Sequence, residues 1–93
     1  MFAHNKFKAY QLAIEFLAVA ESLVSRIPSG HAAMRDQLRR AALSVPLNIA
    51  EGTGKRTIRD RDRYYWIARG SAMECAALLD ALASVRRNRL RAE

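Results

Sequence analysis

A heptad repeat of small and apolar residues in the C-terminal half of the chain is the feature that most constrains its fold. From Tyr64 to Val85, these residues alternate at spacings of four and three. The full set is Tyr64, Ala68, Ser71, Cys75, Leu78, Leu82 and Val85. This spacing places them on one face of an α-helix, where they pack against another helix. The repeat therefore predicts a long helix from about residue 58 to residue 85, which Thr57 can cap.

Two further apolar stripes predict two more helices. Apolar residues at i, i+3, i+4 and i+7 predict a helix from about residue 7 to 27, which the Pro28–Gly30 segment should end. A second stripe predicts a helix from about residue 31 to 51, and we expect Gly52 and Gly54 to mark its end.

Pro46 lies inside the second stripe. Proline removes one backbone hydrogen bond and here would free the carbonyl of Ala42. The stripe keeps its phase across Pro46, so we expect one continuous, bent helix. Asn48 occupies the packing seam next to this proline. We favour a structural role for Asn48 over a binding role. Its amide could bond to the freed backbone or to a tyrosine hydroxyl, or it could fix the register of the helices.

The composition fits one all-α domain over residues 1–93. Apolar residues make up 51% of the chain, and glycine and proline are few. No stretch long enough for a β-strand shows strict alternation of apolar and polar residues. A chain of this length rarely divides its apolar residues between two cores. Tyr64 and Tyr65 are expected to be core aromatics whose hydroxyls reach polar partners.

The single cysteine and the N-terminal region bear on the compartment. Cys75 has no partner for an internal disulfide, which favours a reducing, cytoplasmic location. Lys6 and Lys8 precede an apolar run that loosely resembles a signal peptide. However, Glu15 interrupts this run, and the spacing of its apolar residues is that of an amphipathic helix. No apolar stretch approaches the roughly 20 residues needed to span a bilayer, so we expect no membrane partner.

The sequence supports no catalytic residue, metal site or cofactor. The candidate nucleophiles, which are Ser44, Ser71 and Cys75, all lie in or beside helical stripes and are interpreted as packing residues. One cysteine with His4 and His31 gives no recognised ligand spacing for a metal. Gly52 and Gly54 lack the remainder of a phosphate-binding loop. We therefore expect that the protein is not an enzyme.

Two segments closely resemble the four-helix-bundle family of 23S rRNA intervening sequences in bacteria. They are residues 37–52, QLRRAALSVPLNIAEG, and residues 65–75, YWIARGSAMEC. The motif positions are Ser44, Pro46, Asn48, Glu51, Gly52, Arg69, Gly70 and Ser71. The resemblance covers roughly residues 6–82.

The resemblance implies an up-down antiparallel bundle that assembles as a homopentamer. Relatives include the accessory protein of diversity-generating retroelements, which binds nucleic acid and a reverse transcriptase. After Leu82 this chain departs from the family pattern, because Arg-rich residues stand where a member would turn into a fourth helix. We therefore expect three clear helices, with the fourth helix of the family mostly missing.

The positive charge is uneven and consists mainly of arginine. The net charge is +7, and residues 55–63 and 86–93 each contribute +3. Candidate nucleic-acid-binding residues are Arg39, Arg40, Lys55, Arg56, Arg59, Arg61, Arg63, Arg86 and Arg87. Arginine matches phosphate geometry, yet plain solvated charge explains the same pattern. Without a base-reading motif, any binding to RNA or DNA should be directed at the backbone and sensitive to salt.

Two functions therefore remain open. One is a nucleic-acid-associated accessory module, and the other is a structural or protein-binding oligomer without a nucleic-acid role. Either requires assembly, because the seam of the third helix is longer than the first two helices can cover. We expect its last residues to be partly uncovered in a lone chain and buried in a homo-oligomer. These residues are Leu78, Leu79, Leu82 and Val85.

Overall fold

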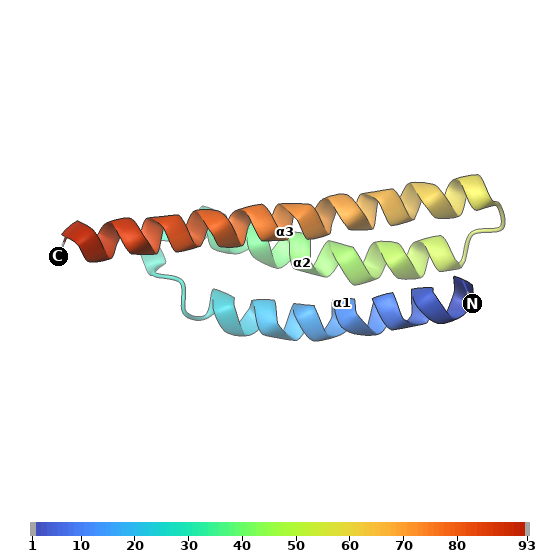
Figure 1. Ribbon diagram of the computed structural model, residues 1–93, viewed down its shortest axis with the longest axis horizontal. Coiled ribbons are helices and arrows are strands. Elements are labelled where there is room, and N and C mark those ends of the chain that lie inside the picture. The colour runs from blue at the N-terminus through green and yellow to red at the C-terminus, as the bar shows by residue number, and fades with distance from the viewer. Residues whose placement is uncertain (1, 93) are drawn as a thin grey trace.

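The chain folds into three antiparallel α-helices. The computed structural model describes residues 2–92, and the side chains of residues 5–91. The elements are α1 (Phe2–Val24), the short 3₁₀-helix η1 (Ser29–His31), α2 (Ala32–Thr53) and α3 (Ile58–Ala92), with no strand within residues 2–92. Figure 1 shows α2 lying between α3 and α1, with consecutive helices running in opposite directions. The predicted all-α, up-down arrangement of three helices is confirmed.

The first helix ends earlier than the sequence predicted. Its apolar stripe continues to Ile27, but α1 stops at Val24. Beyond it, the amide of Arg26 donates to the carbonyl of Leu23 at 3.0 Å, which is the tighter spacing of a turn. Pro28 disfavours helical backbone at the residue before it, so the chain leaves the helix ahead of the proline. Ile27 still packs against the core from this turn.

The second helix is continuous through Pro46, as the phase of its stripe predicted. The ring of Pro46 is fully buried and fills part of the core. The helix continues although proline removes one of its backbone hydrogen bonds. Gly54 has φ −82° and ψ −5°, which is right-handed backbone. The prediction that Gly52 and Gly54 end this helix is therefore wrong in part, because α2 continues through Gly52 and ends at Thr53 without a left-handed glycine.

The third helix starts at its predicted cap. The amide of Asp60 donates to Oγ1 of Thr57 at 3.1 Å, and the amide of Arg61 donates to the carbonyl of Thr57 at 3.1 Å. The Asp60 carboxylate stands in the first turn, where it suits the positive end of the helix dipole. The side chain of Arg61 also turns back, and its Nε donates to the carbonyl of Lys55 at 2.8 Å. These bonds fix the α2–α3 connection.

The core is narrow and built mainly from small side chains. Its fully buried cluster is Ala20, Val24, Leu38, Ala41, Ala42 and Cys75. Within the described residues, α2 packs against both other helices, whereas no Cα atom of α1 comes within 8 Å of one in α3. The bundle is therefore open on the side where α1 and α3 face each other.

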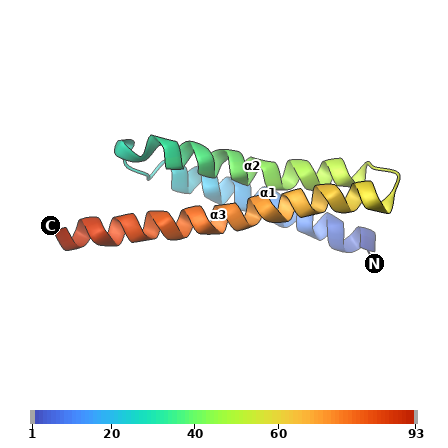
Figure 2. The same cartoon turned by 90° about the horizontal axis from the view of Figure 1, so that it is seen from above.

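The third helix outruns the rest of the molecule. Ser44 of α2 contacts Ser71 of α3, so in antiparallel register the start of α2 lies level with about residue 83. The C-terminal overhang (residues 86–92) therefore projects beyond α2, as Figure 1 and Figure 2 show at the red end of the chain. The Arg-rich tail continues α3 to Ala92, beyond the packing seam that ends at Val85.

Candidate nucleic-acid interface and helix groove

A polar cluster joins α2 to α3 in the middle of the bundle. The hydroxyls of Ser44 and Ser71 lie 2.8 Å apart and share a hydrogen bond. Nδ2 of Asn48 donates to the carbonyl of Ser44 at 2.8 Å and to its Oγ at 2.9 Å. The side chain of Asn48 thus bonds to backbone, as the sequence predicted. The partner is Ser44, however, and not the carbonyl of Ala42 or a tyrosine hydroxyl.

Gly52 lets the two helices approach closely. A Cβ atom placed there would lie 2.8 Å from Cε1 of Tyr65 and 3.1 Å from the backbone oxygen of Arg61. Real Cβ atoms essentially never come within 3.0 Å of another atom, so a larger residue would force the Tyr65 ring or α3 itself to move. Gly52 therefore lies inside α2 at the point where this helix packs closely against α3.

The other residues of the motif lie on the surface. Glu51 forms an ion pair with Lys55, four residues farther along, with 3.2 Å between Oε1 of Glu51 and Nζ of Lys55. The hydrogen bond to Glu51, and after it the nearby Tyr64, raise the pKa of Lys55 and keep its ammonium charged. Arg69 and Gly70 are both exposed. The structure thus divides the motif into contacts between helices and exposed positions on α2 and α3.

An apolar groove, here called the α1–α3 groove, runs along the open side of the bundle. Its wider part has a volume of about 450 Å³, and its narrower part about 260 Å³. Both parts are lined by Val45 of α2 and Ala72 of α3, so they adjoin each other. The α1 wall includes Leu12 and Phe16, and Leu12 leaves 55% of its surface exposed. A helix with an apolar stripe would fill a groove of this shape.

The candidate nucleophiles lie in packed positions. Ser44 and Ser71 bond to each other, and Cys75 is buried in the core. Burial raises the pKa of the Cys75 thiol, which makes it a poor nucleophile. Among the described residues, no group of three or more histidine, cysteine and acidic side chains could hold a metal ion. The side chain of His4 lies outside the described residues.

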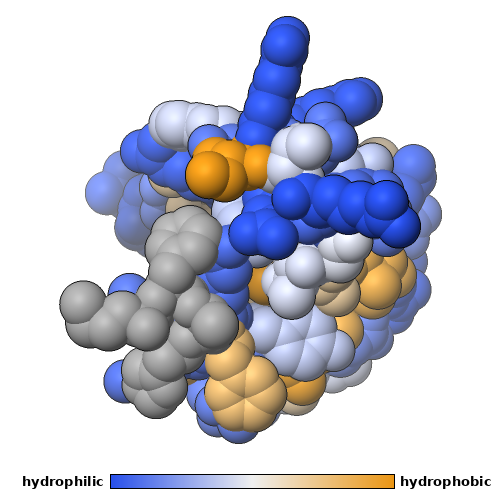
Figure 3. All heavy atoms as spheres, turned by 90° about the vertical axis from the view of Figure 1, so that its right-hand side faces the viewer, coloured by the Kyte–Doolittle hydropathy of each residue, from blue (hydrophilic) through white to orange (hydrophobic). Residues whose placement is uncertain are grey.

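Basic side chains gather at the end of the molecule that carries the α2–α3 connection. This loop-end cluster consists of Lys55, Arg56, Arg59, Arg61 and Arg63. Figure 3 faces this end and shows hydrophilic side chains projecting from it into solvent. Lys6 of α1 reaches the same end, since its Nζ lies 4.6 Å from the centre of the Tyr65 ring. The fold therefore brings a second part of the chain, from α1, to the basic segment of residues 55–63.

The members of the loop-end cluster differ in what they contact. Lys55 is paired with Glu51, and the Nε of Arg61 is used to hold the connection. Arg63 lies over the Tyr64 ring at 5.9 Å. Arg56 and Arg59 are exposed and form no ion pair within the described part of the chain. Of the five residues, Arg56, Arg59 and Arg63 have the most accessible charge.

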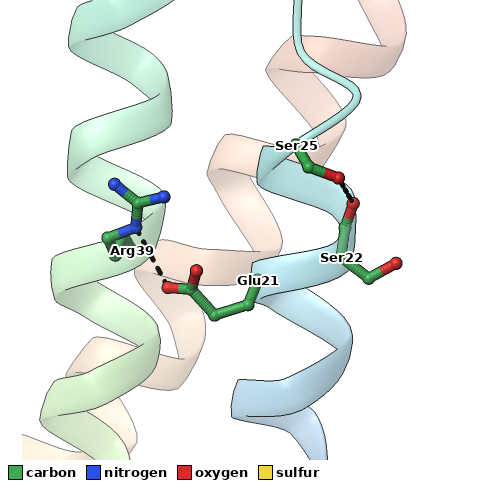
Figure 4. A network of polar contacts seen from close by, with 4 residues as sticks. All are labelled: Glu21, Ser22, Ser25 and Arg39. Carbon is green, nitrogen blue, oxygen red and sulfur yellow. Dashed lines mark hydrogen bonds and ion pairs between the residues drawn. The ribbon is translucent and has the colours of Figure 1, made fainter.

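The remaining predicted basic residues lie elsewhere. Arg86 and Arg87 are exposed on the overhang, at the opposite end of α3 from the loop-end cluster. Arg39 pairs with Glu21 of α1, its Nε donating to the carboxylate at 3.0 Å (Figure 4). Arg40 is exposed midway along α2. The structure therefore separates the nine predicted residues into three places and assembles no single site from them.

Aromatic rings within the loop-end region were not predicted as part of the site. Tyr64 and Tyr65 are half-buried, and each receives a lysine ammonium over its ring, at 5.1 Å from Lys55 and 4.6 Å from Lys6. The Tyr65 hydroxyl lies 3.5 Å from Thr53 Oγ1. The interpretation of both tyrosines as core aromatics is thus only partly right. Trp66, which no stripe explains, is exposed on the same helix.

Comparison with known proteins agrees with the resemblance seen in the motif. Within residues 2–92, no helix combines the length and apolarity needed to cross a membrane. Among curated proteins and solved structures, no match to the chain was found. The model of the 23S rRNA-intervening sequence protein family matches residues 5–88, which span all three helices and nearly the whole chain. The chain therefore belongs to the family of 23S rRNA-intervening sequence proteins.

Proposed function

We propose that the protein is a non-enzymatic homo-oligomer that binds the phosphate backbone of RNA or DNA through its loop-end cluster. The observation that carries this proposal is the convergence of Lys6 with residues 55–63 at one end of the bundle. Exposed arginine and lysine gathered in this way raise the local concentration of a polyanion. Its single cysteine, held as a buried thiol, suits a reducing compartment such as the cytoplasm.

The α1–α3 groove supports the assembly half of the proposal. Its lining is mainly apolar, and large side chains such as Leu12 stay exposed beside it. Leu79 lines the narrower part, while Leu82 and Val85 farther along α3 are only partly buried. Exposed apolar surface of this extent favours an interface. Each helix of the chain has an apolar stripe, so a helix from a second copy is the proposed occupant. The family resemblance suggests five copies.

Binding is tested by titrating labelled RNA and DNA with the full chain at several salt concentrations. Backbone-directed binding should weaken steeply between about 50 and 200 mM salt, with little preference for sequence. Replacing Arg56, Arg59 and Arg63 together by Gln should lower the slope of log Kd against log salt by about 2–3. The mass in solution, measured by light scattering, should not change.

A charge-matched control replaces Arg86, Arg87 and Arg89 by Gln. This variant removes three positive charges from the overhang and should reduce binding less than the loop-end variant. An equal or larger loss would contradict the assignment to the loop-end cluster. A wild-type protein that binds neither RNA nor DNA even at low salt would overturn the nucleic-acid half of the proposal.

The second candidate function is a protein-binding or structural oligomer, which the α1–α3 groove favours. Such a protein would use the groove for a partner helix, and its arginines would serve only solubility. Assembly without any retention of nucleic acid is the result that this function requires. A monomer by light scattering at micromolar concentration would contradict self-assembly in both functions.

A further inference from the structure

Trp66 is a large aromatic residue that the fold leaves in solvent. It lies near the start of α3, with 64% of its surface exposed. Its neighbour in sequence Tyr65 is half-buried and lines the α1–α3 groove, whereas Ile67 is exposed. Trp66 is five residues from Ser71, which places it about 140° round the helix from that inward contact. Neither the core nor the α1–α3 groove therefore uses this ring.

Positive charge surrounds the exposed ring. The guanidinium of Arg69 lies 5.1 Å from the centre of the Trp66 ring, within cation–π range. Arg63 is one turn before Trp66 and Arg59 is two turns before it, and both are exposed. Asp62 is the one acidic residue within a turn of Trp66 on the preceding side. The combination is an aromatic platform set among three arginines.

Gly70 leaves open space beside this platform. It follows Trp66 by four residues, so the two positions are neighbours on the helix surface. A Cβ atom at Gly70 would meet nothing within 4 Å, so no contact inside the chain requires glycine there. Glycine inside a helix is unfavourable relative to alanine. The helix surface beside the exposed ring is therefore open at Gly70.

We propose that Trp66 stacks on an unpaired base of single-stranded nucleic acid, while Arg59, Arg63 and Arg69 contact the flanking phosphates. The proposal rests on the proposed function and narrows its ligand to single strands. Every base has a flat face, so stacking on an aromatic side chain adds affinity without sequence preference. In a duplex the bases are stacked on each other and cannot lie on the ring. The notch at Gly70 gives the base room to lie flat.

The fluorescence of the chain reports on this contact directly, because Trp66 is its only tryptophan. The probes are oligo(U) and oligo(dT) of about 12 nucleotides and a duplex of the same length. We expect both single strands to quench the emission and to bind more tightly than the duplex. Quenching by either one supports stacking.

Three variants test the mechanism. Trp66→Ala should weaken single-strand binding about 5- to 150-fold and leave duplex binding unchanged, and Trp66→Phe should recover part of the loss. Gly70→Leu introduces a good helix former but fills the notch, so it should also reduce the quenching. Met73→Ala is the control, since Met73 is equally exposed seven residues farther along and should have no effect. Circular dichroism checks that each variant remains helical.

The possible failures are distinguishable. Equal binding of single strands and duplex, with no quenching and no effect of Trp66→Ala, would overturn the stacking proposal and leave the backbone-binding function intact. Emission that is already blue-shifted in the free oligomer would place Trp66 in an interface between copies and would also overturn it. Absence of binding to all three probes would overturn the proposed function itself.

Discussion

The hydroxyls of Ser44 and Ser71 lie 2.8 Å apart across the interface between α2 and α3. Ser71 occupies a position that the heptad pattern assigns to packing, and Ser44 faces it from α2. Asn48 donates to both the hydroxyl and the carbonyl of Ser44, so the three residues form one connected cluster. Sliding one helix along the other by a turn would separate the two hydroxyls and take this partner from Ser71, whereas Asn48 and Ser44 would keep their contact within α2. The cluster therefore fixes the register of two helices that share many interchangeable alanines.

Removing the amide of Asn48 should destabilise the fold. We expect Asn48→Ala to lower the free energy of unfolding by about 1–3 kcal/mol, since part-buried groups of Ser44 lose a donor. The matched control is Thr53→Ala on the same helix. Thr53 also bonds a carbonyl one turn back, at 2.9 Å from Ile49, but it is exposed and should cost less than about 0.5 kcal/mol. Equal thermal melts for the two variants would contradict the structural role of Asn48.

Two glycine-to-alanine substitutions should have opposite signs. At Gly52 the new Cβ would press on Tyr65 and on the backbone of Arg61, so the fold should lose about 1–3 kcal/mol. At Gly70 the new Cβ meets nothing within 4 Å, so α3 should gain about 0.5–1 kcal/mol from lower backbone entropy in the unfolded chain. Urea unfolding of both variants checks the prediction, which fails if Gly52→Ala is the more stable one.

Cys75 should react slowly in the folded protein. Burial raises the pKa of its thiol, so less thiolate is present at pH 8 than in a free cysteine. A buried thiol also requires the helices to open, and each 1.4 kcal/mol of opening free energy slows modification tenfold. We expect a thiol reagent to modify the native chain roughly 100-fold more slowly than the chain in urea. Similar rates in the two conditions would show that Cys75 is accessible.

The same shift gives a pH dependence of stability. The thiol of the unfolded chain has the lower pKa, so it loses its proton first as the pH rises. The free energy of unfolding should therefore fall once the pH exceeds the ordinary thiol pKa. Cys75→Ala supplies the control, because it lacks the titrating group and should not show this additional loss. Parallel curves for the two proteins across that range would exclude the effect.

A charge placed in the α1–α3 groove should disrupt assembly. Ala72 lines both parts of the groove, so a second helix that docks there would bury the carboxylate of Ala72→Glu. Ala77→Glu adds the same charge to an exposed position about 140° round α3. We expect light scattering to show a smaller particle for Ala72→Glu alone. Loss of assembly in Ala77→Glu, with Ala72→Glu unaffected, would place the interface on the opposite flank.

Local patterns in the sequence determined the helices and several of their details. The number of helices, the continuity of α2 through Pro46 and the cap at Thr57 all follow from spacing and backbone chemistry within a few residues. The seam from Tyr64 to Val85 also faces inward as predicted, with Ala68 and Cys75 fully buried. The family assignment followed from two segments of the chain in the same way.

Only the tertiary structure decided how the helices meet. Gly52 reads in sequence as a helix stop, but its role depends on how close α3 approaches. The acceptor of the Asn48 amide depends on its rotamer, and the contact between Lys6 and Tyr65 joins residues far apart in the chain. The groove beside Val45 exists because α1 and α3 both pack on α2 and leave space between each other. Helical periodicity is set by local backbone geometry, whereas distances between helices depend on the combined packing of side chains from all three, which no single segment encodes.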